Sequence, residues 1–128
     1  MDAEKRKAIE IAAMDATERW FAAKGFIVRY VHKENLGWDM EAKSGNVKLK
    51  LEVKGTSGAL NTIELTPNEY NESGLHADYH ICIAEHALDP KKVRLHIFRL
   101  DRQDHCWRAD TGKKLAIMPV TSARLQLF

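Results

Sequence analysis

Three observations predict that this chain folds as an α/β domain, with a mixed β-sheet flanked by helices. A long segment at residues 2–24 has the apolar spacing of an amphipathic helix. Residues 38–43 and 47–54 alternate between apolar and charged side chains, as half-buried strands do. The elements expected along the chain follow the order helix, three strands, helix, strand, strand, which fits a sheet covered by helices.

The first element is a helix over residues 2–24 that ends at Gly25, a residue that favours helix termination. The apolar stripe expected to pack on the sheet consists of Ile9, Ala12, Ala13, Ala16, Trp20 and Ala23. A second, narrower stripe consists of Ile11, Met14, Phe21 and Ala22, with Glu18 near its middle. A carboxylate among apolar neighbours needs a partner. We therefore expect Glu18 either to form a surface salt bridge or to join a metal site.

The next three strands are expected at residues 26–31 and in a hairpin that joins residues 38–43 to residues 47–54. Gly45-Asn46 suits a two-residue hairpin loop. With this loop, apolar side chains face apolar ones across the hairpin, whereas a slip of one residue would place charges in the core. The predicted cross-strand pairs are Ser44 with Val47, Glu41 with Lys50, Asp39 with Glu52, and Trp38 with Val53.

The remaining elements are predicted from shorter patterns. Thr66 is expected to cap a second helix that begins at Pro67, with Glu69 completing a capping box. The N-terminus of such a helix attracts anions. Further strands are expected at residues 63–65, 78–85 and 92–100, and residues 115–120 are interpreted either as a last edge strand or as part of a tail.

The whole chain, residues 1–128, is predicted to be one domain with a core at about residues 2–100 and a C-terminal extension at residues 101–128. Its hydrophobic content of 45% and charged content of 30% are typical of soluble proteins. No apolar run approaches the roughly 20 residues of a membrane span, and the charged N-terminus lacks the apolar core of a signal peptide. The expected compartment is therefore the cytoplasm. The net charge of +2 indicates little about partners.

The predicted pairing of Asp39 with Glu52 is electrostatically unfavourable. Side chains directly opposite each other in an antiparallel pair have Cβ atoms about 4.5–5.5 Å apart, so two carboxylates there repel each other. A cation between them removes this repulsion, and Mg²⁺ suits the position because it binds through one or two carboxylates and keeps several waters. Lys54 lies near both on the same face of the strand. The alternative is a solvated charged face, because Lys48 and Lys50 share it.

At these residues the chain resembles the PD-(D/E)xK, or restriction-endonuclease-like, superfamily, in which an acidic residue on one strand precedes a Glu-x-Lys on the next. Asp39 matches the first position, and Glu52-Val53-Lys54 matches the second. More narrowly, the chain resembles the domain family named after the C-terminal part of the plant protein NO VEIN, over roughly residues 10–100. This resemblance is carried by Gly37-Trp38-Asp39-Met40, Glu52-Val53-Lys54-Gly55-Thr56 and Leu65-Thr66-Pro67-Asn68-Glu69.

The superfamily resemblance implies a restriction-endonuclease-like αβββαβ core and a nuclease activity. It implies that Asp39 and Glu52 hold Mg²⁺ or Mn²⁺ and that Lys54 assists the attacking water or the transition state. It also implies that Glu18 adds a third carboxylate from the first helix. The expected function is Mg²⁺-dependent cleavage of phosphodiester bonds, with DNA as the preferred substrate. The alternative is a nuclease-like module that binds nucleic acid or a protein partner, in a defence or repair complex, without cutting.

Two residues are predicted to contact the substrate. Thr56 follows the site strand, where its hydroxyl or amide can approach a phosphate oxygen, and Lys50 belongs to a basic rim beside Trp38. The rim consists of Arg29, Lys33, Lys48, Lys50 and Lys54. Such residues also occur on the solvated face of ordinary sheets. A domain of this size has little surface with which to wrap a duplex, so sequence specificity would require a homodimer or a neighbouring protein.

Overall fold

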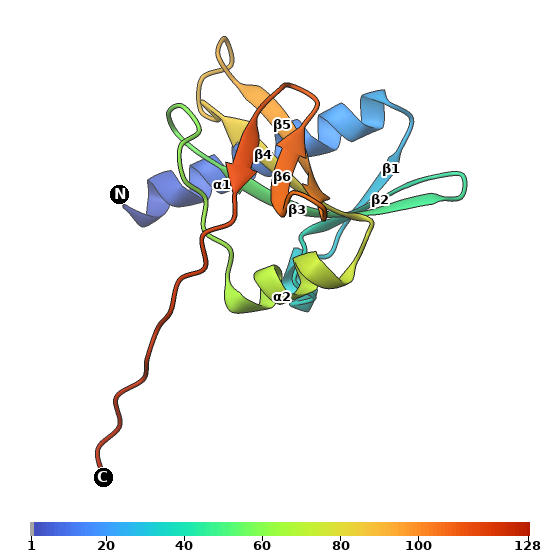
Figure 1. Ribbon diagram of the computed structural model, residues 1–128. Coiled ribbons are helices and arrows are strands. Elements are labelled where there is room, and N and C mark those ends of the chain that lie inside the picture. Colours follow the sequence, from blue (N-terminus) through green and yellow to red (C-terminus); the bar gives the residue numbers. More distant parts are fainter. Residues whose placement is uncertain (1) are drawn as a thin grey trace.

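The computed structural model describes residues 2–128 and confirms the α/β prediction (Figure 1). Seven strands form one mixed sheet in the order of the chain, and each neighbouring pair is antiparallel except β3 with β4. The strands are β1 Ile27–Tyr30, β2 Met40–Ser44, β3 Val47–Gly55, β4 Tyr79–Glu85, β5 Arg94–Asp101, β6 Cys106–Ala109 and β7 Lys114–Ala116. The helices are α1 Ala3–Ala23, the short 3₁₀ helix η1 His32–Glu34, and α2 Pro67–Leu75. The parallel β3–β4 pair requires a crossover, and α2 lies in it.

Helix α1 begins and ends close to the predicted residues. The Asp2 side chain caps it by accepting the Lys5 amide, and the chain leaves it through Gly25 at a φ of 91°. The face that packs on the sheet is rotated from the predicted stripe: Phe21 is buried, whereas Trp20 is 40% exposed. Phe21 holds this orientation because its ring packs edge-on against Phe26, while the alanines of the predicted stripe bury little area. The buried residues of α1 are Ile9, Ala13, Met14, Thr17 and Phe21.

The β2–β3 hairpin has the predicted register. Glu41 pairs with Lys50 and Ser44 with Val47, and Gly45 has a φ of 58° in the loop, as the first position of a type II′ turn requires. The strand β2 starts at Met40, two residues later than expected. Asp39 therefore lies just before the strand, where its backbone amide still donates to the Leu51 carbonyl.

One face of the sheet packs against α1. Leu51 and Val53 of β3 point into this core, so the period-two alternation of β3 is confirmed. Gly55 ends the strand where α1 approaches most closely: a Cβ at this position would lie 2.9 Å from Ile9 Cγ2 and 3.0 Å from Ala13 Cβ. A glycine is therefore needed here by packing, since any side chain would push α1 off the sheet.

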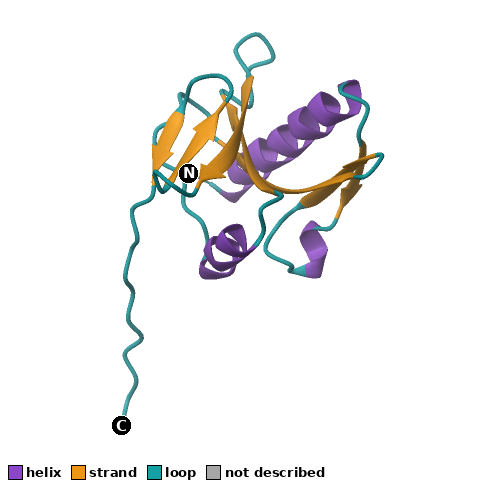
Figure 2. Ribbon diagram, turned by 45° about the vertical axis from the view of Figure 1, so that its right-hand side comes forward, coloured by secondary structure: helices purple, strands orange, loops and turns teal. Residues whose placement is uncertain are grey.

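The opposite face carries a second cluster built on Tyr79, Ile81 and Ile83 of β4, as predicted for one face of that strand, and the segment before α2 covers it (Figure 2). The prediction of a strand at Ile63–Leu65 is wrong. Residues 61–66 form no strand; instead the Ile63 and Leu65 side chains pack on the cluster. The predicted capping box of α2 is confirmed.

The sheet continues beyond the predicted core through β6 and β7, and residues 117–128 then leave the domain as an extended segment (Figure 1). Strand β7 is an edge strand, but it spans Lys114–Ala116 and ends before the predicted residues 115–120 do. Trp107 of β6 is buried in the second cluster, which explains why these short strands belong to the core. Within residues 2–128, no helix has the length and apolar character needed to cross a membrane.

Candidate functional site

The turn that leads into β2 is fixed between α2 and β4. Gly37 has a φ of 98°, and a Cβ at this position would lie 2.7 Å from Glu72 Cγ of α2. The Tyr79 hydroxyl donates a hydrogen bond of 2.7 Å to the Gly37 carbonyl. Only glycine satisfies both the left-handed backbone and the close approach to the helix. The residue that follows this turn by two positions, Asp39, is therefore held in a defined place.

The Asp39 carboxylate points along β3 toward Glu52. Its Oδ2 accepts a hydrogen bond of 2.8 Å from the Val53 backbone amide, and continuing the hairpin register places it beside Glu52, as predicted. Burial raises the pKa of Asp39, although the hydrogen bonds from the Val53 amide and with the Glu52 side chain act to lower it. The two carboxyl groups are thus close enough to affect each other's protonation.

Glu52 is the most unusual ionisable group of the site, since only 2% of its surface is exposed. Burial, followed by the charges of Asp39 and Glu69, raises the pKa of Glu52 to about 10, despite the opposing charge of Lys54. The like charges nearby disfavour a third ionised carboxylate in this position. Without another cation, Glu52 therefore stays protonated at neutral pH.

Lys54 lies between Glu52 and Glu69. Its Nζ is 3.4 Å from Glu52 Oε2 and 2.8 Å from Glu69 Oε1. Burial acts to lower the pKa of Lys54, but the two glutamates outweigh it and the net shift is upward. The ammonium therefore stays charged, as expected from the sequence.

Glu69 joins the cluster from the first turn of α2. Its Oε1 accepts hydrogen bonds from both Lys54 Nζ and the Thr66 amide, so one side chain completes the capping box and contacts the site. Burial acts to raise the pKa of Glu69, but Lys54 and the Thr66 amide lower it on balance. The sequence explains Glu69 by its capping role alone. The one signal that could have identified it as a site residue was its place in the third run of the family resemblance.

The cluster around Lys54 is rich in carboxyl groups, the ligand type that hard divalent cations prefer. Three carboxyl groups, those of Asp39, Glu52 and Glu69, surround the single ammonium of Lys54, so full ionisation would leave an excess of negative charge. Among residues 2–128, no group of three or more His, Cys, Asp or Glu side chains is arranged so that all could hold one metal ion. Mg²⁺ commonly binds to one or two carboxylates and keeps several waters as its other ligands. Asp39 and Glu52 would be those two carboxylates.

Glu18 lies apart from this cluster. Its Oε1 accepts a hydrogen bond of 2.7 Å from the Tyr30 hydroxyl of β1. The charge of Glu18 does not shift the pKa of Asp39 or of Glu52. The structure therefore gives Glu18 a hydrogen bond from a tyrosine hydroxyl instead of the expected salt bridge, and the third carboxylate near the site comes from α2 instead of α1.

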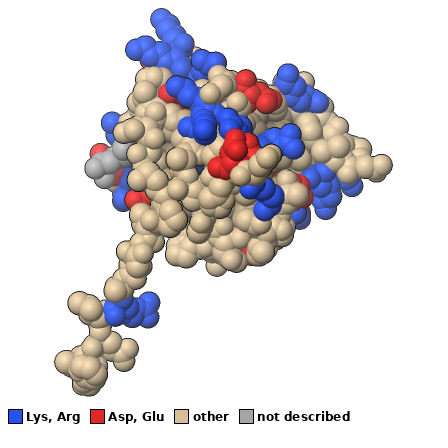
Figure 3. Space-filling view, in the orientation of Figure 1, with Lys and Arg blue, Asp and Glu red and all other residues tan. Residues whose placement is uncertain are grey.

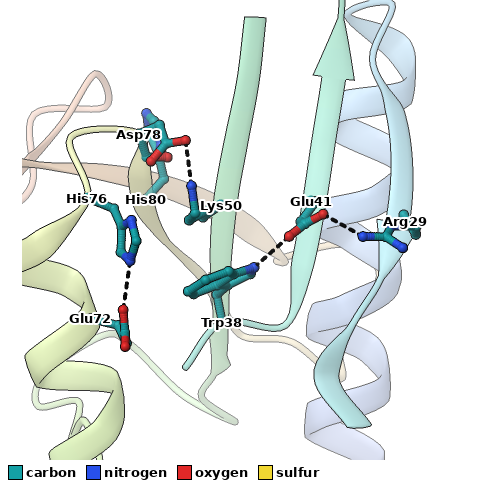
Figure 4. A network of polar contacts seen from close by, with 8 residues as sticks. All are labelled: Arg29, Trp38, Glu41, Lys50, Glu72, His76, Asp78 and His80. Carbon is teal, nitrogen blue, oxygen red and sulfur yellow. Dashed lines mark hydrogen bonds and ion pairs between the residues drawn. The ribbon is translucent and has the colours of Figure 1, made fainter. Parts of the chain in front are cut away.

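The two predicted substrate contacts are engaged within the chain. The Thr56 amide donates to the Ala84 carbonyl, and its hydroxyl donates to the Gly58 carbonyl at 2.7 Å. Lys50 Nζ is 2.8 Å from Asp78 Oδ2 and lies over the Trp38 ring (Figure 4). A phosphate would have to displace the Gly58 contact to accept a hydrogen bond from the Thr56 hydroxyl, and it would compete with Asp78 for the Lys50 ammonium.

Arg29, a further member of the predicted basic rim, is also paired within the chain (Figure 4). Arg29 Nη2 is 2.8 Å from Glu41 Oε1, and the other oxygen of Glu41 accepts a hydrogen bond from Trp38 Nε1. On the far side of Trp38, His76 packs edge-on against its ring and is 2.7 Å from Glu72. These contacts fix the indole beside the turn that carries Asp39.

Comparison with protein-family models finds a match to "Protein NO VEIN, C-terminal" over residues 9–98. The chain belongs to this family. No curated protein and no solved structure matches it. The region matched to the NO VEIN C-terminal family runs from α1 into β5 and contains the whole cluster from Asp39 to Glu69. Strands β6 and β7 and the extended segment after them lie outside the matched region.

Proposed function

We propose that this NO VEIN C-terminal domain is a Mg²⁺-dependent nuclease that cleaves phosphodiester bonds, with DNA as its preferred substrate. The observation that carries the proposal is the convergence of Asp39, Glu52 and Lys54 on one face of the sheet. A carboxylate as deeply buried as Glu52, beside two further acidic groups, is typical of a functional site.

Each residue has a distinct role in this proposal. Asp39 and Glu52 would hold the cation, and a cation bound there would supply an activated water and offset negative charge on the phosphate. Lys54, kept protonated by Glu52 and Glu69, places a positive charge where the attacking oxygen and the phosphate meet. Glu69 holds the Lys54 side chain in that position.

The order of the elements supports the wider assignment to the PD-(D/E)xK superfamily. Helix α1, strands β1 to β3, helix α2 and strand β4 follow one another as in the αβββαβ core. Glu52 and Lys54 share one face of β3, as the superfamily pattern requires, whereas Asp39 lies directly before β2 instead of within the strand.

A second candidate function is a nuclease-like module that binds without cutting, as part of a defence or repair complex. One observation favours it: Arg29, Lys50 and Lys54 are each paired with a carboxylate. Phosphate affinity depends on cations that are free to contact the backbone. A site with these cations occupied would require a partner to supply further positive charge.

The test combines cleavage with metal binding. Plasmid and single-stranded DNA are incubated with the protein in Mg²⁺, in Mn²⁺ and in EDTA, beside Asp39→Asn, Glu52→Gln and Lys54→Met. These amide substitutions preserve the shape of the acids, and the asparagine side chain still offers an oxygen to the Val53 amide. Lys114→Met is the matched control, because Lys114 is an exposed strand residue of β7 that lies outside both the cluster and the basic rim.

The nuclease proposal predicts metal-dependent cutting that is retained in Lys114→Met and lost in the three site variants. Calorimetry should show Mg²⁺ binding that Asp39→Asn and Glu52→Gln weaken and Lys54→Met retains. Salt-sensitive DNA binding without cutting in any metal would favour the module instead. Cutting that survives in all three variants would exclude this cluster as the active site.

A further inference from the structure

The C-terminal arm, defined as residues 118–128, exposes an unusual amount of apolar surface. Met118 is 82% exposed, Val120 89%, and Leu125 and Leu127 each 94%. In the part of the chain that the structure describes, the arm forms no helix or strand and takes part in no side-chain hydrogen bond or ion pair. Figure 3 shows it as a mostly uncharged strip that leaves the body of the domain. Exposed apolar side chains concentrated in one segment in this way are typical of a surface that binds a partner.

A groove beside the base of the arm has matching properties. It has a volume of about 460 Å³ and lies between α2 and the strands β5 and β6. Two large side chains of α2 line it and remain exposed, Tyr70 at 45% and Leu75 at 66%. Leu100, Trp107 and Ile117 add further apolar lining, and Asn71, Ser73, Arg102 and His105 supply polar groups. Its volume lies within the range of sites that hold several side chains of a ligand.

We propose that the arm of one molecule occupies this groove on a second copy of the same chain, forming a dimer by reciprocal exchange of arms. The arm supplies leucine and phenylalanine side chains, and the groove supplies the exposed apolar residues of α2 that they would cover. This interaction is independent of the proposed nuclease activity and uses a different surface of the domain.

The geometry of the arm favours a second copy over the groove of its own chain. Ile117 lines the groove, so the arm starts at the groove wall. Pro119 lies two residues further on, and it restricts Met118 to extended backbone and fixes its own φ, so the base of the arm is extended. Figure 1 shows the arm running away from the domain. Eleven extended residues reach roughly 36 Å, enough to cross to a neighbouring molecule.

Exchange between two copies also gives a closed assembly. Because each molecule has one arm and one groove, a two-fold axis lets both arms and both grooves pair and leaves none exposed. An arm that bound to a third molecule instead would leave unpaired ends and produce open chains. The proposal therefore predicts a dimer and no larger species.

The experiment measures the mass of the full chain by light scattering and sedimentation over a wide range of concentration. The expected species has twice the 14.6 kDa of one chain. Leu127→Asp in the arm and Leu75→Asp in the groove should each raise the dissociation constant about tenfold or more, since each places a charge in the contact. Leu88→Asp is the control, because Leu88 is exposed at 43% and lies outside the groove.

Mixing the two variants distinguishes the exchange of arms from a dimer that forms through another surface. The Leu75→Asp chain keeps a working arm and the Leu127→Asp chain keeps a working groove, so the mixture should form mixed dimers through one intact contact. Circular dichroism on each variant establishes that it is folded. A full chain that stays monomeric at every concentration, including one whose arm folds onto its own groove, overturns the proposal. A dimer that neither substitution weakens, or a mixture that fails to associate, overturns it as well.

Discussion

Two buried glutamates on neighbouring strands have opposite environments. Glu85 at the end of β4 accepts a hydrogen bond of 2.6 Å from the Leu60 amide through one oxygen, and its other oxygen is 3.0 Å from Nε2 of the fully buried His96. The His96 and Leu60 hydrogen bonds lower the pKa of Glu85 to about 2. Glu52 on β3 has acidic neighbours instead, and its pKa is raised to about 10.

This difference separates a structural carboxylate from one suited to bind a ligand. The Glu85 cluster is complete within the chain, because His96 also contacts Thr111 through its second ring nitrogen and every member has a partner. It holds the segment after β3 against the sheet through the Leu60 amide. The Glu52 cluster has three carboxyl groups for one ammonium, so it gains most from an added cation.

The largest expected effect is on Mg²⁺ affinity. Glu52→Gln should weaken it at least about a hundredfold, since loss of groups that only support a ligand already costs 10–100-fold. Glu85→Gln should leave it unchanged, because Glu85 belongs to the other cluster. Isothermal titration of Mg²⁺ into both variants measures the two values. Equal losses in the two variants would contradict the contrast between the glutamates.

The second effect is on folding stability, where substitution of Glu85 should have the larger effect and substitution of Glu52 the smaller one. Glu85→Gln should lower the free energy of unfolding by about 1–3 kcal/mol, because it weakens the contacts to His96 and the Leu60 amide inside the protein. Glu52→Gln should leave the metal-free protein as stable as before, or more stable, because glutamine resembles the protonated acid. Urea denaturation in EDTA provides the comparison. A larger loss in Glu52→Gln than in Glu85→Gln would reverse the expected order.

The hairpin shows which part of the site the sequence specifies. Alternation at period two and a loop of Gly45-Asn46 leave one register that keeps charges out of the core, so the approach of Asp39 to Glu52 follows from local pattern. The start of β2 at Met40 does not follow from this pattern. The Asp39 side chain accepts the hydrogen bond from the Val53 amide, whereas in a longer strand a backbone carbonyl would accept it.

Contacts between distant segments were less predictable. Glu69 is 15 residues from Lys54 in sequence, and its capping role already accounts for its presence. The apolar neighbours of Glu18 suggested a place in the site, but the Tyr30 hydroxyl satisfies its carboxylate away from the cluster. The predicted orientation of α1 was wrong because Trp20 and Phe21 are adjacent and both strongly apolar, and only the position of Phe26 decides between them.

The third effect is a pH dependence of opposite sign in the two clusters. A glutamate has an ordinary pKa of 4.5, so between pH 4.5 and about 10 the folded metal-free protein retains a proton on Glu52 that the unfolded chain has lost. Stability should therefore fall as the pH rises through this window, by up to about 1.4 kcal/mol per unit. Glu85 acts in reverse: its contribution is present above pH 4.5 and is lost as the pH falls toward about 2.

Denaturation curves at a series of pH values in EDTA test both signs. Glu52→Gln should flatten the alkaline decline, and Glu85→Gln should flatten the acidic one. Mg²⁺ at saturation should also remove the alkaline decline, because it stabilises the ionised form of Glu52. A wild-type curve that is level from pH 5 to 9 would contradict the pKa of about 10 and remove the main contrast with Glu85.

The smallest effect distinguishes the two roles of Glu69. Glu69→Gln keeps a side chain that can complete the capping box but removes one of the charges that raise the pKa of Glu52. The free energy of unfolding near pH 5 should fall by about 0.5–1.5 kcal/mol, because the Lys54 ammonium keeps only a neutral hydrogen-bond partner at that position, while the alkaline decline should end at a lower pH than in the wild type. Thr66→Ala removes the cap itself and should cost about 0.5–2 kcal/mol at every pH. If Glu69→Gln instead behaves like Thr66→Ala, with a uniform loss and an unchanged decline, then Glu69 only caps α2, and the excess of acid around Glu52 is smaller than the comparison with Glu85 requires.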